Sequence, residues 1–328
     1  MSSIREVAKL AKVSPATVSR VMNGTANVSP EKKARVMKAV EETGFVPNEV
    51  ARSLFKKSAR TIGLVLPNIE NPFFIEMASA IENEADRHGY RVLLYNTRGD
   101  FEKEKSALQI LTSMNADGII ITRSSDRLQP YIEACTIPVV ITDTVFSEGK
   151  ANAYVHCDFY EGGRIATEHL LKCGCRNIVC MKAEQKFYSA RARYEGYRDV
   201  CRENNMTEKI VDCDYTYGRG LQAAENLLKM YPEADGIVAS NDMVAIAALK
   251  VLFNKGVSVP GNIKIVGFDD IPAASIISPE LTTISQPIDE IGAKAVQLII
   301  DNSWPDDEAG RHVFPVKLVV RQTTAVSE

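Results

Sequence analysis

The segments ADGIIIT at residues 116–122 and ADGIVAS at residues 234–240 resemble each other, and each stands among short apolar runs that alternate with helical periods. Alternation of strands and helices is typical of a parallel sheet with helices on its faces. The likeness of the two segments indicates an internal repeat. The sequence therefore predicts an α/β body of two similar, doubly wound parallel-sheet subdomains with a cleft between them.

The predicted elements of this body follow one another from residue 61. Strands are expected at residues 61–67, 90–96, 116–122, 137–143, 176–183, 209–215, 234–240 and 263–270. Helices are expected at residues 73–89, 102–114, 191–204, 218–232 and 243–256. We expect the chain to cross between the subdomains near residues 143–160 and 270–290. Ligands of such sheets bind beyond the carboxyl ends of the strands, so the residues that follow each apolar run are the ones to inspect.

Polar and aromatic side chains gather at these predicted strand ends. Carboxylates and amides pair with vicinal hydroxyls, Arg donates in a fork, and aromatic rings cover the C–H faces of a sugar. Taken singly, Asp269 or Asn241 is more typical of a helix cap or turn, and Phe73 and Phe74 are more typical of a core. Their convergence predicts a polyol site. The candidate effector-binding residues are Phe73, Phe74, Thr122, Asp143, Arg193, Tyr215, Asn241, Asp269 and Gln286.

The charge of the chain is divided unevenly. Residues 1–60 contain 12 Lys and Arg against 5 Asp and Glu, a net charge of +7, whereas the remaining residues contain 27 against 37, a net charge of −10. Clustered basic residues release counterions when they bind a polyanion, and an acidic body is repelled by the same phosphates. The first segment is therefore a candidate nucleic-acid-binding module.

This basic segment has the pattern of a helix-turn-helix. Apolar residues at helical spacing predict a first helix over residues 4–11. A second helix of about eight residues begins at Pro15, with Ser14 as its cap. A third helix follows Ser29 and closes the module by Gly44. A three-helix bundle that binds no DNA is the alternative.

The second of these helices presents a polar face. Val18, Val21 and Met22 point inward, which leaves small, hydroxyl-bearing and basic side chains on the outside. Small side chains touch thymine methyls, Arg forks onto guanine O6 and N7, and hydroxyls reach phosphates, so this face suits a major groove. The candidate DNA-binding residues are Ser14, Pro15, Ala16, Thr17, Ser19, Arg20 and Asn23.

Two longer stretches carry a family resemblance. VAKLAKVSPATVSRVMNG at residues 7–24 and ETGFVPNEVARSL at residues 42–54 resemble the recognition helix and the hinge helix of the lactose-repressor (LacI/GalR) family of bacterial transcription regulators. The likeness covers essentially the whole chain. It implies a headpiece over residues 1–46, a hinge helix and linker over 47–60, and an effector-binding and dimerisation domain over 61–328 with a periplasmic-binding-protein-like fold.

The hinge segment carries apolar side chains that a solvated linker does not need. A helix of about two turns, capped by Asn48, is too short to be stable alone, so we expect it to fold on DNA beside its twin. Leu54 is expected to wedge between base steps from the minor groove, with Arg52 on a phosphate. Packing of Leu54 onto the body is the alternative.

Further motifs match the effector cleft of the same family. NPFF, RARYEGY, SND, GFDD and LTTISQP resemble motifs shared with periplasmic sugar-binding proteins, and ribose-operon repressors are the most similar members. The resemblance implies that the candidate residues in these motifs contact a small sugar such as ribose, with Tyr215 as a stacking ring. Asp143 is followed by Thr144 where many members have Arg, and Asp158 by Phe159 where many have Asn. These departures indicate a different sugar or a different link between subdomains.

The expected partners are operator DNA and a small effector. Few residues follow the last predicted strand, so a tetramerising heptad tail is not expected, and a homodimer would read a palindromic operator. Whether the effector induces or co-represses stays open. A different sugar, a nucleobase or a corepressor protein is the alternative within the family, and a sugar receptor without DNA binding is the alternative at class level.

Other functional classes find little support. The chain has no G-x-S-x-G, P-loop or H-E-x-x-H motif, so we expect no catalytic residues and no cofactor. Its seven Cys have no zinc-site spacing, so no metal is expected. Without a long apolar run or a signal-like start, we expect a cytoplasmic protein that does not enter the membrane.

Overall fold

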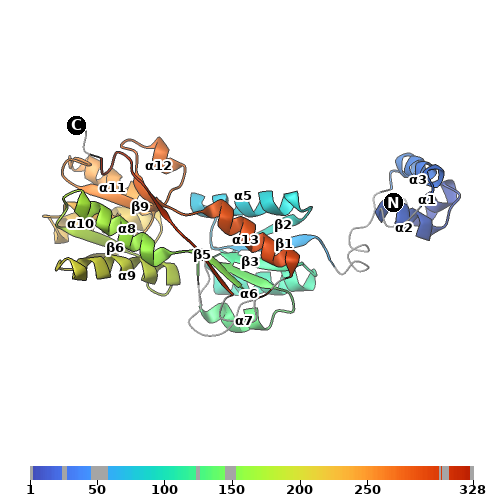
Figure 1. Cartoon of the computed structure of the whole chain (residues 1–328), viewed down its shortest axis with the longest axis horizontal. Coiled ribbons are helices and arrows are strands. Elements are labelled where there is room, and N and C mark those ends of the chain that lie inside the picture. Colours follow the sequence, from blue (N-terminus) through green and yellow to red (C-terminus); the bar gives the residue numbers. More distant parts are fainter. Residues whose placement is uncertain are drawn as a thin grey trace. The chain divides into compact units, whose positions relative to one another are not determined.

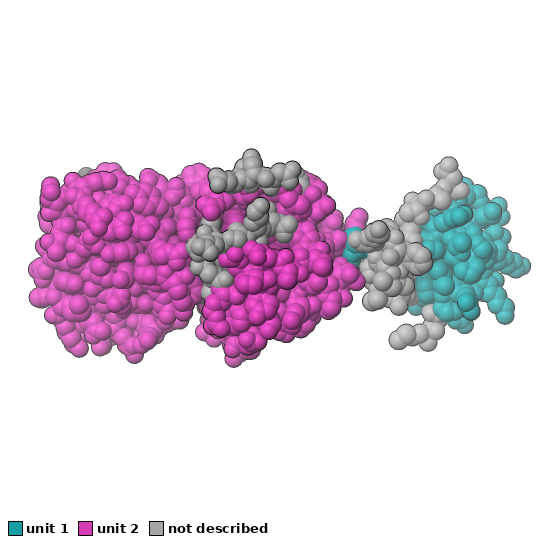
Figure 2. Space-filling view, turned by 90° about the horizontal axis from the view of Figure 1, so that it is seen from below, with its two compact units in different colours: residues 1–59 teal, residues 60–328 magenta. Residues whose placement is uncertain are grey.

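The computed structural model describes residues 3–23, 28–45, 58–122, 126–144, 153–302, 304 and 310–325. The chain divides into two compact units, Met1–Ala59 and Arg60–Glu328 (Figure 2). The predicted hinge residues Asn48, Arg52 and Leu54 lie outside the described residues. Their roles therefore stay predictions from the sequence.

The described part of the first unit is a bundle of three helices, α1 (Ile4–Leu10), α2 (Pro15–Asn23) and α3 (Pro30–Thr43) (Figure 1). The backbone N–H of Thr17 donates to Oγ of Ser14 at 3.1 Å, which confirms the predicted cap of α2. α3 ends at Gly44, whose φ of +58° is favourable for glycine. The helices enclose a small core of Val7, Ala8, Ala11, Val18, Val21, Val36 and Ala39.

The second unit contains two subdomains, each built on a six-stranded sheet. In the N-terminal subdomain the strand order is β11-β5-β4-β3-β1-β2, and every neighbouring pair is parallel. Its elements are β1 (Thr61–Leu66), α5 (Pro72–Arg87), β2 (Arg91–Asn96), α6 (Phe101–Ser113), β3 (Gly118–Thr122), η1 (Asp126–Leu128), α7 (Gln129–Glu133), β4 (Val139–Thr142), β5 (Ala153–Cys157), α13 (Ile288–Asp301) and β11 (Arg311–Phe314).

The C-terminal subdomain repeats this arrangement with the strand order β12-β10-β9-β8-β6-β7. Its pairs are parallel except for the edge strand β12, which runs antiparallel to β10. Its elements are α8 (Phe159–Lys172), β6 (Ile178–Lys182), α9 (Tyr188–Glu203), β7 (Lys209–Asp212), α10 (Tyr217–Met230), β8 (Gly236–Ala239), α11 (Asp242–Asn254), β9 (Lys264–Asp269), α12 (Ala273–Ile276), β10 (Thr282–Ser285) and β12 (Lys317–Val319).

The chain passes between the two sheets three times within the described residues. The first crossing is residues 157–159, between β5 and α8, and the second is residues 285–288, between β10 and α13. The third, at residues 314–317, joins β11 to β12 and appears in Figure 1 as the dark red segment that links the two sheets. The sequence indicated the first two crossings but not this third one.

The sheets are covered on both faces, as expected for a doubly wound fold. In the N-terminal subdomain α5 and α13 pack on one face and α6 and α7 on the other. In the C-terminal subdomain α8 and α9 cover one face and α10 and α11 the other. One hydrophobic cluster includes residues of both sheets, from Ile62 in β1 to Phe268 in β9. The two subdomains therefore share a continuous core at the crossings.

Helices α8 and α9 lie close together because two glycines face each other between them. A Cβ added at Gly163 would overlap the backbone carbonyl oxygen of Arg193, and one added at Gly196 would overlap that of Tyr160. The absence of side chains at these positions lets the helix backbones touch. This contact sets the position of α9, which carries Arg193.

We expect Gly163→Ala to lower the free energy of unfolding by about 1–3 kcal/mol, because the added methyl overpacks a rigid backbone contact. Urea denaturation of the whole chain measures the effect. The matched control is Gly218→Ala in α10, where an added Cβ meets no atom within 4 Å. This control should be neutral or stabilise by about 0.4–1 kcal/mol. Equal stability of the two variants would show that the α8–α9 contact tolerates a side chain.

Candidate functional site

The predicted DNA-binding residues of the headpiece lie on α2 or at its ends. The side chains of Pro15, Ala16 and Arg20 are exposed. Ser14 is exposed too, but its hydroxyl serves as the cap and lies 2.9 Å from Oγ1 of Thr17. The first turn of α2 has no acidic residue, so no carboxylate offsets the positive end of its helix dipole. Thr17 and Ser19 are half-buried, and Asn23 is the last residue of the helix.

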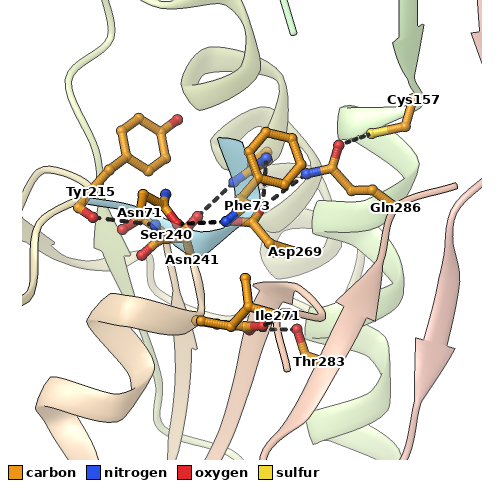
Figure 3. A network of polar contacts seen from close by, with 12 residues as sticks. Asn71, Phe73, Cys157, Tyr215, Ser240, Asn241, Asp269, Ile271, Thr283 and Gln286 are labelled. Carbon is orange, nitrogen blue, oxygen red and sulfur yellow. Dashed lines mark hydrogen bonds and ion pairs between the residues drawn. The ribbon is translucent and has the colours of Figure 1, made fainter. Parts of the chain in front are cut away.

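Asp269 is at the centre of the second group of predicted residues. It is the last residue of β9, has an unusual φ of +116° and is only 4% exposed. Its Oδ1 accepts hydrogen bonds from Nε2 of Gln286 at 2.8 Å and from Nη2 of Arg193 at 3.4 Å (Figure 3). A non-glycine residue at such a φ is strained, and strain of this kind is concentrated at functional sites.

Arg193 projects from α9 and is held from several directions. Its Nη1 donates to the backbone oxygen of Ser240 at 2.7 Å, and its guanidinium carbon lies 3.6 Å from the centre of the Phe268 ring. Burial opposes the charge, but Asp269 and Tyr215 raise the pKa of Arg193 above its ordinary value. Its Nε is also buried and has no hydrogen-bond partner among the described residues. This donor is open to a ligand acceptor.

Asn241 and Asn71 are both helix caps. Asn241 is fully buried, its Oδ1 accepts from the backbone N–H of Val244 at 3.0 Å, and its Nδ2 donates to the backbone oxygen of Tyr215 at 3.2 Å. Asn241 is therefore a helix cap, which is the role more typical of a single Asn in its sequence context. Asn71 caps α5 by accepting from the backbone N–H of Phe73 at 3.1 Å. These caps hold the starts of α11 and α5 in place beside the site.

The two predicted phenylalanines pack against each other in the core. Their rings lie edge to face, 5.2 Å apart between centres, and both are buried. In Figure 3 the ring of Phe73 points toward the Asp269–Gln286 pair. Both residues belong to the shared hydrophobic cluster, and Phe73 is 3% and Phe74 1% exposed. The direction of its ring makes Phe73 a candidate to face a ligand.

The remaining predicted residues lie around this group. Thr122 is buried at the end of β3, where its hydroxyl accepts from Oγ1 of Thr142 at 3.1 Å. Asp143 follows β4, is 7% exposed and lies near enough to Arg193 to raise the pKa of that residue. The half-buried Tyr215 lies under the same guanidinium, with its ring centre 5.8 Å from the Arg193 carbon.

Sequence reasoning missed several residues of this group. Phe268 and Phe159 supply rings to Arg193, at 3.6 and 5.2 Å from the guanidinium carbon. Ser240 supplies a backbone acceptor, and Cys157 donates to Oε1 of Gln286 at 3.1 Å. Phe268 and Ser240 lie within the quoted motifs GFDD and SND. For Cys157 the sequence held no signal, because its partner is 129 positions away.

A cavity of about 430 Å³ adjoins Asp269 and Gln286. Its walls also carry the carboxyl groups of Glu76, Asp270 and Asp289. Burial, with the charges of Asp270 and Asp289, raises the pKa of Glu76 above its ordinary value. Asp269 and Gln286, but not Arg193 or Phe73, therefore line space in which a small molecule fits.

The described part of the chain contains no group of three or more His, Cys, Asp or Glu side chains able to hold a metal ion. None of its helices has the length and apolar character needed to cross a membrane.

Two protein families match the chain in succession. Residues 3–48 match the family described as bacterial regulatory proteins, lacI family. Residues 59–317 match the family described as periplasmic binding proteins and sugar binding domain of LacI family. Together they span the headpiece and the body.

A curated relative and two solved structures resemble the chain over much of its length. The ribose operon repressor of Halalkalibacterium halodurans is 40% identical over 329 residues, covering 100% of this chain and 98% of that protein. The lac repressor dimer bound to operator and the anti-inducer ONPF has a TM-score of 0.89 at 27% identity, with 99% of each chain covered. A periplasmic binding protein/LacI transcriptional regulator from Alkaliphilus metalliredigens QYMF, complexed with D-xylulofuranose, has a TM-score of 0.74 at 34% identity, covering 81% of this chain and 100% of that one.

Proposed function

Because the chain belongs to the LacI family of bacterial regulatory proteins, we propose that it is a sugar-responsive repressor of a carbohydrate operon. It binds a palindromic operator as a homodimer in the cytoplasm and is switched by a small sugar of the ribose class. The observation that carries this proposal is the convergence of the buried Arg193, Asp269 and Gln286, of which the last two line a cavity, in a chain that also has a basic helix-turn-helix headpiece.

The operator half of the proposal depends on α2. Arg20 is exposed on this helix, and Ala16 is exposed one helical turn before it. A recognition helix of this kind inserts into a major groove, and two copies in a dimer read half-sites about one turn of DNA apart. The likeness to the lac repressor dimer bound to operator supports both the docking mode and the dimer.

The effector half depends on how the polar groups converge. Arg193 offers the open Nε as a donor, and the buried Asp269 carboxylate beside it is an acceptor group. Vicinal hydroxyls of a furanose or pyranose ring match such a donor and acceptor set, and the Phe73 ring can cover a C–H face. The relative named ribose operon repressor and the complex with D-xylulofuranose, a five-carbon sugar, favour a pentose.

The switch follows from the three crossings. A sugar that contacts groups on both subdomains favours one angle between them, and a ligand shifts an equilibrium only by its differential affinity for the two states. Closure or opening at residues 157–159, 285–288 and 314–317 would change the arrangement of the N-terminal subdomain in the dimer. We propose that an inducing sugar favours the arrangement in which the two hinge segments cannot pair on DNA.

Gel-shift titration of the purified chain against a palindromic operator tests this function. We expect operator affinity without sugar, and a fall of tenfold or more when D-ribose is added, on the order of the coupling that allosteric sites commonly show. D-xylulose, D-glucose and a purine base complete the panel. If another compound shifts the complex and ribose does not, the pentose assignment fails while the repressor assignment stands. Absence of operator binding at low salt would contradict the repressor assignment itself.

Two alternatives receive less support. A nucleobase or a corepressor protein could replace the sugar within the same family. The purine base in the gel-shift panel tests the nucleobase alternative. A sugar receptor without DNA binding would have no use for the basic helix-turn-helix headpiece. We place no catalytic step on the chain, and measurable consumption of a sugar by the purified protein would contradict that assignment.

Leu54→Ala tests the hinge as predicted from the sequence. Loss of an apolar wedge should weaken operator binding by about tenfold, since unstacking a base step is then no longer compensated by the inserted side chain. Sugar affinity and urea denaturation of the body should not change. Unaltered operator affinity would refute the wedge and favour packing of Leu54 on the body.

A further inference from the structure

A chain of contacts links the first two crossings to the candidate effector site. Cys157 is the last residue of β5, and its Sγ donates to Oε1 of Gln286 at 3.1 Å. Gln286 lies in the second crossing, and its Nε2 donates to Oδ1 of Asp269 at 2.8 Å (Figure 3). Arg193 donates to the same oxygen at 3.4 Å. The thiol is therefore one end of a path that leads to the Arg193 guanidinium.

The chemistry of these partners fixes the direction of the Gln286 amide. A glutamine amide has an acceptor oxygen on one side and an NH₂ donor on the other, and a carboxylate can only accept. Only one orientation therefore satisfies both the Cys157 thiol and the Asp269 carboxylate. Burial raises the pKa of Cys157 well above its ordinary value, so the thiol keeps its proton near neutral pH. Cys157 is fully buried and Gln286 is 6% exposed, which leaves little access for a water that could replace the thiol.

The position of Cys157 makes this contact sensitive to the angle between the subdomains. Cys157 and Gln286 belong to different crossings, so the 3.1 Å contact requires the two segments to keep their present separation. Hydrogen bonds weaken steeply once distance or angle leaves a narrow range. A change in the angle between the sheets that alters this separation would therefore weaken the contact.

On the premise of the proposed function, we propose that Cys157 is a positioning residue of the effector switch. Its S–H holds Gln286 in the orientation that supports Asp269, and it favours the arrangement of the two subdomains in which the sugar-binding groups converge. The thiol contacts no sugar in this scheme and acts entirely through Gln286.

Two substitutions at Cys157 in the full-length protein test the proposal against D-ribose by isothermal titration. Cys157→Val keeps the size of the side chain but leaves Oε1 of Gln286 buried without a donor, so we expect sugar affinity to fall about five- to tenfold. Cys157→Ser restores a donor and should stay within about twofold of the unsubstituted protein. Urea denaturation without sugar verifies that both variants fold. Equal affinities of the Val and Ser variants would overturn the proposal.

A double-mutant cycle without sugar makes the result independent of the effector's identity. Gln286→Met removes the acceptor, and the cycle combines it with Cys157→Val. If the contact exists, the unfolding equilibrium constant of the double variant should rise at least about threefold less than the product of the two single-variant increases. Strictly multiplicative effects would overturn the positioning role. Failure of the unsubstituted protein to bind ribose would count against the proposed effector alone.

Discussion

Arg193→Ala is expected to abolish the sugar response, with sugar affinity reduced about 100-fold or more, equivalent to about 3 kcal/mol. The guanidinium bridges Ser240 and Asp269 and provides the open Nε donor. Without it, the buried Asp269 carboxylate loses its ion pair with a guanidinium and keeps the hydrogen bond from Gln286. Isothermal titration with the sugar that releases the operator measures the loss.

Stability must be measured on the same variant, because a broken buried ion pair is costly in itself. We expect the free energy of unfolding to fall by about 3 kcal/mol in Arg193→Ala. The matched control is Arg202→Ala on the same helix, where the side chain is 64% exposed and its ion pair with Asp199 spans 3.8 Å. A surface pair of this kind contributes about 0–1 kcal/mol, so the control should keep its sugar affinity. A folded Arg193→Ala variant with normal affinity would remove this residue from the site.

Arg20→Ala is expected to weaken operator binding about 10- to 100-fold, which corresponds to the loss of one bidentate contact to a guanine. Arg20 is exposed in α2, so the substitution removes no internal packing. Titrations on the operator and on random duplex of equal length distinguish a base contact from a phosphate contact. A base contact lowers affinity for the operator far more than affinity for random DNA.

Arg35→Ala provides the control for charge, since Arg35 is also exposed in the headpiece but lies on α3. Its loss should weaken operator and random DNA alike, with a salt dependence smaller by about one released ion. Equal behaviour of the Arg20 and Arg35 variants on both duplexes would show that Arg20 contributes charge and no sequence readout.

Much of the headpiece could be predicted because its signals are local. The Ser14 cap, the Pro15 start and the Gly44 end of the helices all depend on neighbours within a few residues, and the structure contains each of them. The same holds for the strands of the body, whose apolar runs agree with β1, β3 and β8 to within a few residues. The family resemblance added the hinge, whose residues 47–57 lie outside the described part of the chain.

The site was only partly predictable because its contacts join distant segments. The sequence placed Asp269, Arg193 and Gln286 at strand ends or near them, and the structure brings all three together. The sequence did not reveal that both the oxygen and the nitrogen of the Asn241 amide form hydrogen bonds within the protein. The residue type of Asn241 indicated a helix cap, but its second hydrogen bond reaches the backbone of Tyr215, 26 positions away, and no periodic pattern records that.

The sequence by itself determined the order of elements, the division into headpiece and body, and the residue types available for a polyol, because periodicity and capping act over one or two turns of chain. Tertiary structure alone decided which of those side chains meet. The third crossing at residues 314–317, the glycine contact that sets α9 in place, and the Cys157–Gln286 hydrogen bond all depend on segments far apart in the chain. Their partners are chosen by the packing of whole sheets and helices, which no local pattern encodes.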